Sequence, residues 1–269
     1  MSGRVGANPQ IGPPADGTDA SPIAVPWLHW SHVHRYVNKA WDPEHAPHHS
    51  GIGLTGSGKS YLFVNGILRP MCSNDRVLLI DSKGDDKLVS AQGRPVTQIE
   101  NRPWYQNIGK KPKPFDHWQR LVVHGNRHRE RGKAQAQVAR ALERVYNEGD
   151  WVVFFDEEID ITSAAPGLGL GAYTDELRRM GRSRSISVLG LTQSPVQVRR
   201  SFYDQASFAW IGRIRDRDRQ KRLLEIGGMT KDELPFIASL QRQQWLLAAD
   251  NGEFFARSKV VARRGSKAA

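Results

Sequence analysis

The feature that most constrains this chain is the stretch Gly53–Ser60, which reads GLTGSGKS. Gly53, Gly58, Lys59 and Ser60 satisfy the spacing GxxxxGK[ST]. Glycines let such a loop curl until its backbone N–H groups surround phosphate oxygens, and the helix that follows presents its positive N-terminus to them. The stretch therefore predicts a phosphate-binding loop between a buried β-strand and an α-helix.

Particular side chains of this loop are expected to hold ATP and Mg²⁺. Lys59 should reach the β and γ phosphates, and Ser60 should offer a hydroxyl ligand to Mg²⁺. The run Tyr61–Leu68 has the pattern of the helix that must follow the loop, and Pro70 is expected to end it. The predicted ATP-binding residues of the loop are Gly53, Thr55, Gly56, Ser57, Gly58, Lys59 and Ser60.

Two carboxylates follow an apolar run later in the chain. Trp151–Phe155 is typical of a buried strand and leads directly into Asp156 and Glu157. Open α/β sheets bind ligands at the carboxyl ends of their strands. Asp156 is therefore predicted to bind the nucleotide's Mg²⁺ through its water shell, and Glu157 to orient and polarise the attacking water. Without the phosphate loop, such a run would indicate only a strand that meets a solvated turn.

A further candidate residue lies at the end of the β run Ile186–Thr192. Gln193 follows this run directly, and Ser194 and Pro195 resemble the N-cap and first turn of a helix. A side-chain amide can both donate and accept hydrogen bonds, so Gln193 is expected to sense the γ phosphate and align water. Taken alone, a glutamine at a strand end is commonplace.

Short β-rich runs alternate with amphipathic helical runs from His48 onward, which predicts an α/β domain with a mostly parallel sheet flanked by helices. A helical stripe recurs at Ala134, Val138, Leu142 and Val145. The turn Asn251–Gly252 predicts a C-terminal β-hairpin between Gln244–Asp250 and Glu253–Val261. The other predicted strands are Arg76–Ile80, Gln119–Val123, Trp151–Phe155, Ile186–Thr192 and Ser207–Ile211.

Four regions are expected along the chain. Residues 1–26 lack periodicity and are predicted to form a flexible tail, residues 27–47 an N-terminal extension, 48–262 a single ATPase domain, and 263–269 a basic tail. Residues 27–49 are rich in histidine and tryptophan. Such a segment can form a metal site or pack its tryptophans on the domain, and the absence of zinc-type spacings and of cysteines favours packing.

Composition limits the partners and the compartment. The formal net charge of +11 and the pI of about 10.0 favour polyanionic partners such as double-stranded DNA, although a solvated basic surface explains them equally well. Cys72 is the only cysteine, so an intramolecular disulfide is excluded. Apolar runs are too short to span a bilayer, and we expect a cytoplasmic protein, in a host cell or associated with a virion, that does not insert into membranes.

Three separated motifs together resemble the FtsK/HerA superfamily of ATP-driven motors. Pro47 and His48 with Gly53–Ser60 are similar to its "PH…GxTGSGKS" opening, and Leu78–Gly84 (LLIDSKG) resembles its "hhhDPKG" strand, with Ser82 in place of proline. Gly181 and Arg182, followed by ISVLGLTQ, are similar to its "GR…TQ" segment. The resemblance covers roughly residues 48–261.

This resemblance implies a RecA-like P-loop NTPase domain that assembles into a ring, usually a hexamer, with an arginine finger reaching ATP across each subunit boundary. Arg182 is the candidate finger, and Arg178, Arg179 and Arg184 are its alternatives. The implied function is an ATP-hydrolysing motor that translocates or packages double-stranded DNA for a virus or mobile element. The alternatives are a motor for virion assembly or protein extrusion, and a non-enzymatic nucleotide-binding scaffold.

Two segments and one set of arginines are candidate polymer contacts. The segment 101–119 interleaves aromatic residues with lysines, which suits nucleic acid or a surface loop, and 162–171 is rich in alanine and glycine and suits a pore lining. The clustered arginines expected to hold DNA phosphates are Arg199, Arg200, Arg213, Arg215 and Arg217.

Overall fold

One sheet of nine strands organises the computed structural model, which describes residues 25–41, 46–84, 86–100, 113–123, 127–226, 229–249 and 254–259. The strand order is β3-β4-β2-β5-β6-β1-β7-β8-β9. The strands are β1 (His49–Ile52), β2 (Arg76–Asp81), β3 (Arg94–Val96), β4 (Trp118–Val122), β5 (Trp151–Phe155), β6 (Ser187–Thr192), β7 (Phe208–Ile211), β8 (Gln244–Ala249) and β9 (Phe254–Lys259).

The pairing of the strands confirms the predicted fold class. Strands β1 to β7 pair with one another in parallel, whereas β8 runs antiparallel to β7 and β9 antiparallel to β8. The predicted C-terminal hairpin is therefore present, although its turn lies outside the described residues. The short strand β3, with Pro95 at its centre, gave no sequence signal and lies at the sheet edge, where proline is tolerated.

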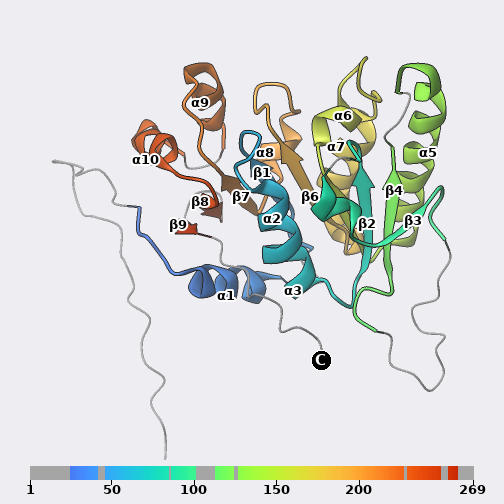
Figure 1. The fold of residues 1–269 in the computed structure, drawn as a ribbon, viewed down its shortest axis with the longest axis horizontal. Helices are drawn as coiled ribbons and strands as arrows, with labels where there is room; N and C mark the ends of the chain where they lie inside the picture. The colour runs from blue at the N-terminus through green and yellow to red at the C-terminus, as the bar shows by residue number, and fades with distance from the viewer. Residues whose placement is uncertain are drawn as a thin grey trace, which may run out of the picture.

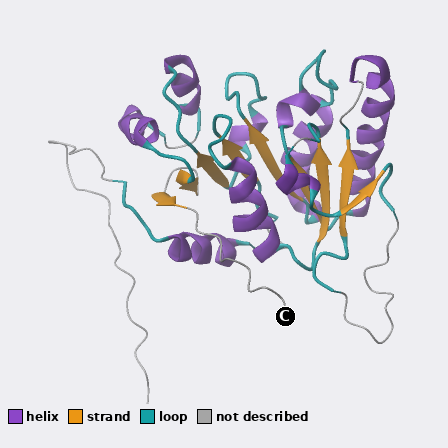
Figure 2. Ribbon diagram, in the orientation of Figure 1, coloured by secondary structure: helices purple, strands orange, loops and turns teal. Residues whose placement is uncertain are grey.

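Helices cover both faces of the sheet (Figures 1 and 2). In Figure 1 the arrowheads of β2 and β6 point to the top, and α1 lies near the bottom. The helical elements are α1 (Trp30–Ala40), α2 (Lys59–Tyr61), the π-helix η1 (Leu62–Leu68), α3 (Arg69–Met71), α4 (Lys87–Ser90), α5 (Arg127–Glu148), α6 (Glu158–Thr162), α7 (Gly171–Met180), the 3₁₀ helix η2 (Gly181–Arg184), α8 (Ser201–Asp204), α9 (Arg217–Leu223), the 3₁₀ helix η3 (Lys231–Glu233) and α10 (Leu234–Ser239).

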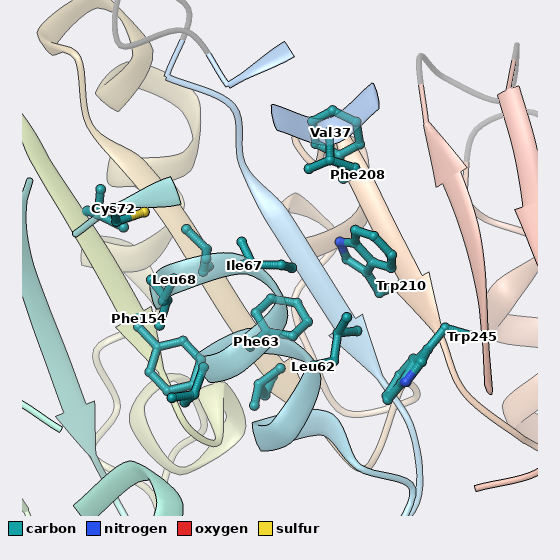
Figure 3. Close-up of a cluster of buried hydrophobic side chains, with 14 of the residues drawn as sticks. Val37, Leu62, Phe63, Ile67, Leu68, Cys72, Phe154, Phe208, Trp210 and Trp245 are labelled. Atoms are coloured by element: carbon teal, nitrogen blue, oxygen red, sulfur yellow. The ribbon is translucent and has the colours of Figure 1, made fainter. Parts of the chain in front are cut away.

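Alternate residues of each central strand supply two different cores. Val77 and Leu79 of β2 face the cluster that contains Phe63 of η1 and Trp210 of β7, part of which is drawn in Figure 3. Leu78 of the same strand faces the opposite cluster, which includes the predicted stripe of α5. Because successive strand side chains point to opposite faces, a continuous apolar run is buried on both sides.

The N-terminal extension packs on the domain through α1. Trp30 is buried among core residues, and its ring lies 6.0 Å from that of Trp210. Among the described residues, no three histidine, cysteine or acidic side chains gather as a metal site. The buried position of Trp30 supports the packing interpretation of this segment. The predicted tails, most of the segment 101–119 and the end of the predicted domain lie outside the described residues.

Two predicted helix boundaries are wrong. The helix after the phosphate loop does not end before Pro70 but continues through α3. Pro70 lies in the first turn of this α-helical segment, where a backbone N–H needs no partner within the segment, so the missing N–H of proline is tolerated. No helix begins at Ser194 and Pro195. Residues 194–200 form turns instead, closed by the Tyr203 hydroxyl, which donates to the Pro195 carbonyl at 2.5 Å.

Candidate nucleotide-binding site

The phosphate loop leaves the sheet at the carboxyl end of β1, between β6 and β7. The backbone N–H of Gly53 donates to the Thr192 carbonyl at 3.1 Å, so the start of the loop is tied to the end of β6. Gly56 and Gly58 have φ angles of 76° and 95°, a region that residues with a Cβ rarely adopt. The glycines thus allow the tight curl from which α2 begins at Lys59.

A segment from the far end of the chain braces this loop. The Gln243 N–H donates to the Ser57 carbonyl at 3.0 Å, and a Cβ placed on Gly58 would lie 3.1 Å from the Cγ of Gln243. The neighbouring Arg242 is exposed and lines the cavity beside the loop. Neither residue carried a sequence signal, because both follow α10 almost two hundred positions after the loop.

Lys59 is folded back onto its own loop. Its Nζ donates to the carbonyls of Gly53 at 2.7 Å and Leu54 at 3.2 Å. Burial lowers the pKa of Lys59 to about 8, and the nearby Glu157 carboxylate opposes that shift. Lys59 Nζ contacts neutral carbonyls in this structure, and a bound phosphate would compensate the positive charge of the buried ammonium. The geometry therefore suits an anion-binding site.

Asp156 lies at the carboxyl end of β5, as predicted, and is 2% exposed. Burial raises the pKa of Asp156 to about 7, although Lys83 opposes the shift. Its Oδ2 atom is buried and has no hydrogen-bond partner among the described residues. A buried carboxylate oxygen without a donor is suited to an Mg²⁺ ion or its water shell, and Ser60 lines the same cavity, so the residues present fit that metal.

Both carboxylate oxygens of Glu157 are held by donors. Its Oε1 accepts from the Gln193 backbone N–H at 3.0 Å, and its Oε2 accepts from Lys83 Nζ, also at 3.0 Å. Burial lowers the pKa of Lys83, but the carboxylates of Glu157 and Asp156 outweigh burial and raise it. Lys83 belongs to the LLIDSKG motif, which by itself predicts no role for the lysine. Its position two residues after the end of β2 was the available signal.

Gln193 is brought to the phosphate loop through its side chain. The Thr55 hydroxyl donates to Gln193 Oε1 at 2.5 Å. Gln193 lines one cavity of about 590 Å³ together with Lys59, Lys83 and Asp156. The lining includes Thr55, Gly56, Gly58, Lys59, Ser60, Tyr61, Lys83, Asp86, Leu88, Asp156, Gln193 and Arg242.

The arginines proposed as finger candidates lie elsewhere. Arg182 is in η2, just before β6 begins. It therefore lies near the amino ends of the parallel strands, whereas the phosphate loop lies at their carboxyl ends. Its Nη2 donates to the Gln205 carbonyl at 2.7 Å. Arg178 is fully buried and so is poorly placed to reach a neighbouring subunit, whereas the Arg184 guanidinium stacks 4.5 Å from the Tyr146 ring.

A buried ion pair anchors the residue next to Glu157. Arg178 Nη2 donates to Glu158 Oε2 at 2.5 Å, and both side chains are almost completely buried. The pair lies against Gly190 of β6, where an added Cβ would come 1.9 Å from Glu158 Oε2. Glycine at this position therefore leaves the space that the pair occupies. Sequence reasoning considered Arg178 only as an alternative finger and missed this structural role.

The fold matches those of known ATPases, although no protein-family model and no curated protein sequence matches the chain. B204, the genome packaging NTPase of Sulfolobus turreted icosahedral virus 2, has a TM-score of 0.55 and 14% identity, with 81% of this chain and 99% of B204 covered. The chain has the fold of a P-loop ATPase. Structures of B204 with AMPPCP and with ATP-gammaS match as well.

Two further structures show the same fold. VirB4 of Thermoanaerobacter pseudethanolicus has a TM-score of 0.60 and 11% identity over 81% of this chain and 90% of VirB4. The cytoplasmic domain of the type VII secretion ATPase EccC from Thermomonospora curvata has a TM-score of 0.50 and 19% identity, with 81% of this chain and 26% of that chain covered. These structures confirm the predicted fold, that of a P-loop ATPase.

None of the helices in the described ranges combines the length and the apolar character that a bilayer crossing requires.

Proposed function

We propose that this chain hydrolyses ATP at the cavity beside the phosphate loop. The observation that carries the proposal is that Lys59, Asp156 and Gln193 line one cavity of about 590 Å³ at the carboxyl ends of the strands. Glu157 is held next to this lining by the Gln193 N–H and by Lys83. In this reaction the loop N–H groups and Lys59 bind the phosphates, and Glu157 takes up the proton of the attacking water. Mg²⁺, held by Ser60 and Asp156, would neutralise charge on the phosphate oxygens.

We further propose that the energy moves or packages double-stranded DNA. The support is the net charge of +11 and the exposure of every arginine in the predicted DNA-binding set. B204, with the same fold, is a genome packaging NTPase. A translocating protein must grip the repeating phosphate backbone without reading bases, and arginine side chains suit that contact. The set consists of Arg199, Arg200, Arg213, Arg215 and Arg217.

We propose that the chain assembles into a ring, usually a hexamer, in the cytoplasm or with a virion. In such a ring, ATP lies at each boundary between subunits. Arg182 is our candidate for the finger that a neighbouring subunit supplies. Arg182 is exposed and lies near the amino end of β6, away from the cavity of its own chain, so contact with ATP would require a neighbouring subunit. The second candidate function is a motor of the same core that drives virion assembly or protein extrusion without gripping DNA. EccC, which has this fold, is a secretion ATPase.

ATP turnover measured with and without double-stranded DNA, across a salt series, tests these proposals. We expect turnover in the wild type, loss of ATP binding in Lys59→Ala, and retained binding without turnover in Glu157→Gln. DNA affinity should fall steeply with salt, with log K dropping by about 0.9 per neutralised phosphate for each tenfold rise in salt. No turnover refutes the ATPase. Turnover that ignores DNA, with weak binding that is flat in salt, favours the protein motor.

A further inference from the structure

A chain of hydrogen bonds joins the phosphate loop to Glu157 through one residue. The Thr55 hydroxyl donates to the side-chain oxygen of Gln193 at 2.5 Å, and the backbone N–H of Gln193 donates to Glu157 Oε1 at 3.0 Å. Gln193 is thus held by the loop through its side chain while it holds the proposed base through its backbone. We propose that Thr55 is a positioning residue of the ATPase reaction that acts through the Gln193 amide.

The chemistry of the amide explains what Thr55 achieves. A glutamine side chain has an oxygen that only accepts and an NH₂ group that only donates. Because the Thr55 hydroxyl occupies Oε1, the amide is fixed with Nε2 as the group left to contact a ligand in the cavity. Among the described residues, none accepts a hydrogen bond from Nε2. A γ-phosphate oxygen or the attacking water is the acceptor that this donor fits.

Loss of the Thr55 hydroxyl would release this orientation. The amide could then turn over and direct its oxygen at the phosphate oxygens, which repel it. The backbone N–H of Gln193 would still donate to Glu157 Oε1, so the expected loss concerns the orientation of the side-chain amide. The loop itself should be spared, because Thr55 is exposed and the loop binds phosphate through its backbone.

Substitution of Thr55 can remove the hydroxyl while keeping the shape of the side chain. Thr55→Val is nearly isosteric and has no hydroxyl, whereas Thr55→Ser keeps the donor. We expect Thr55→Val to lower kcat roughly tenfold, as for one lost orienting hydrogen bond, with the Kd for ADP within about twofold of wild type. Thr55→Ser should restore most of kcat.

A double-mutant cycle with Gln193→Ala tests the route. If Thr55 acts through Gln193, adding Thr55→Val to Gln193→Ala should lower kcat no further. An equal loss in both backgrounds would show that Thr55 contacts ATP directly, and weakened ADP binding would show that it shapes the loop. Unchanged kcat in Thr55→Val would also overturn the proposal.

This inference rests on the proposed ATPase function, and the two fail differently. A wild-type protein without ATP turnover refutes the function itself. A wild-type protein with turnover, together with a Thr55→Val variant that matches it, refutes only the role of Thr55.

Discussion

Asp156→Asn should stabilise the nucleotide-free protein while it destroys the metal site. The Asp156 carboxyl is 2% exposed, and its Oδ2 finds no donor among the described residues. Burial raises its pKa from the ordinary 3.8 to about 7. Ionising this group in the folded protein therefore costs free energy that ionising it in the unfolded chain does not. An amide, which never ionises, avoids that cost.

The magnitude follows from the two pKa values. The folded-state pKa of Asp156 lies above the unfolded value. The contribution of the protonated Asp156 carboxyl to the free energy of unfolding is therefore fully present below about pH 4, and it is lost as the pH rises through 7. The loss reaches about 4 kcal/mol at pH 8 and about 2 kcal/mol at pH 5. These are upper values for the gain in the free energy of unfolding on Asp156→Asn.

Urea unfolding at pH 5 and pH 8, in EDTA and without nucleotide, measures this gain. We expect Asp156→Asn to be more stable than wild type, with a larger difference at pH 8, and to gain nothing when ATP and Mg²⁺ are added. A variant less stable than wild type at pH 8, or a gain that does not change with pH, would refute the reasoning.

Asp81→Asn is a matched control one strand away. Asp81 is also fully buried at a strand end, but its oxygens accept from Arg120 at 3.0 Å and from the Gly84 N–H at 2.7 Å. Its substitution weakens a satisfied ion pair and leaves Arg120 with less compensation. Asp81→Asn should therefore lower the free energy of unfolding, by about 3 kcal/mol. Opposite changes in the free energy of unfolding at these two buried aspartates would distinguish a functional carboxylate from a structural one.

Three further outcomes are expected. Lys83→Met should lower kcat with little change in ATP affinity, because Lys83 donates to one carboxylate oxygen of Glu157. Stopped-flow binding and steady-state rates measure the two quantities. A higher kcat in the variant would show that the contact is inhibitory instead. Gly190→Ala should lower the unfolding midpoint in urea by displacing the buried ion pair beside it, at a cost of about 3 kcal/mol, and an unchanged midpoint would contradict this. Arg182→Ala should reduce turnover on the order of 10³-fold, and inactive Lys59→Ala subunits mixed into the same rings should restore part of it; failure of every mixture counts against a finger in trans.

The sequence by itself determined the parts of the site that local pattern encodes. The loop Gly53–Ser60 is recognisable because phosphate binding needs glycines and a lysine at fixed offsets along one stretch of chain. Asp156, Glu157 and Gln193 were found because each follows an apolar run, and the carboxyl ends of parallel strands share one edge. The predicted boundaries of β2, β4, β5, β6 and β7 lie within one residue of the structure, whereas the short strand β1, also buried on both faces, was not among the predicted strand ranges.

Only the tertiary structure decided which side chains meet. Thr55 and Gln193 are 138 positions apart, and Lys83 and Glu157 are 74 apart. Their contacts depend on the order of strands in the sheet, which places β6 between β5 and β1. Strand order is fixed by how the whole set of apolar faces packs together, so no local window of sequence contains it. For the same reason the sequence could not tell that Arg178 is buried in an ion pair with Glu158.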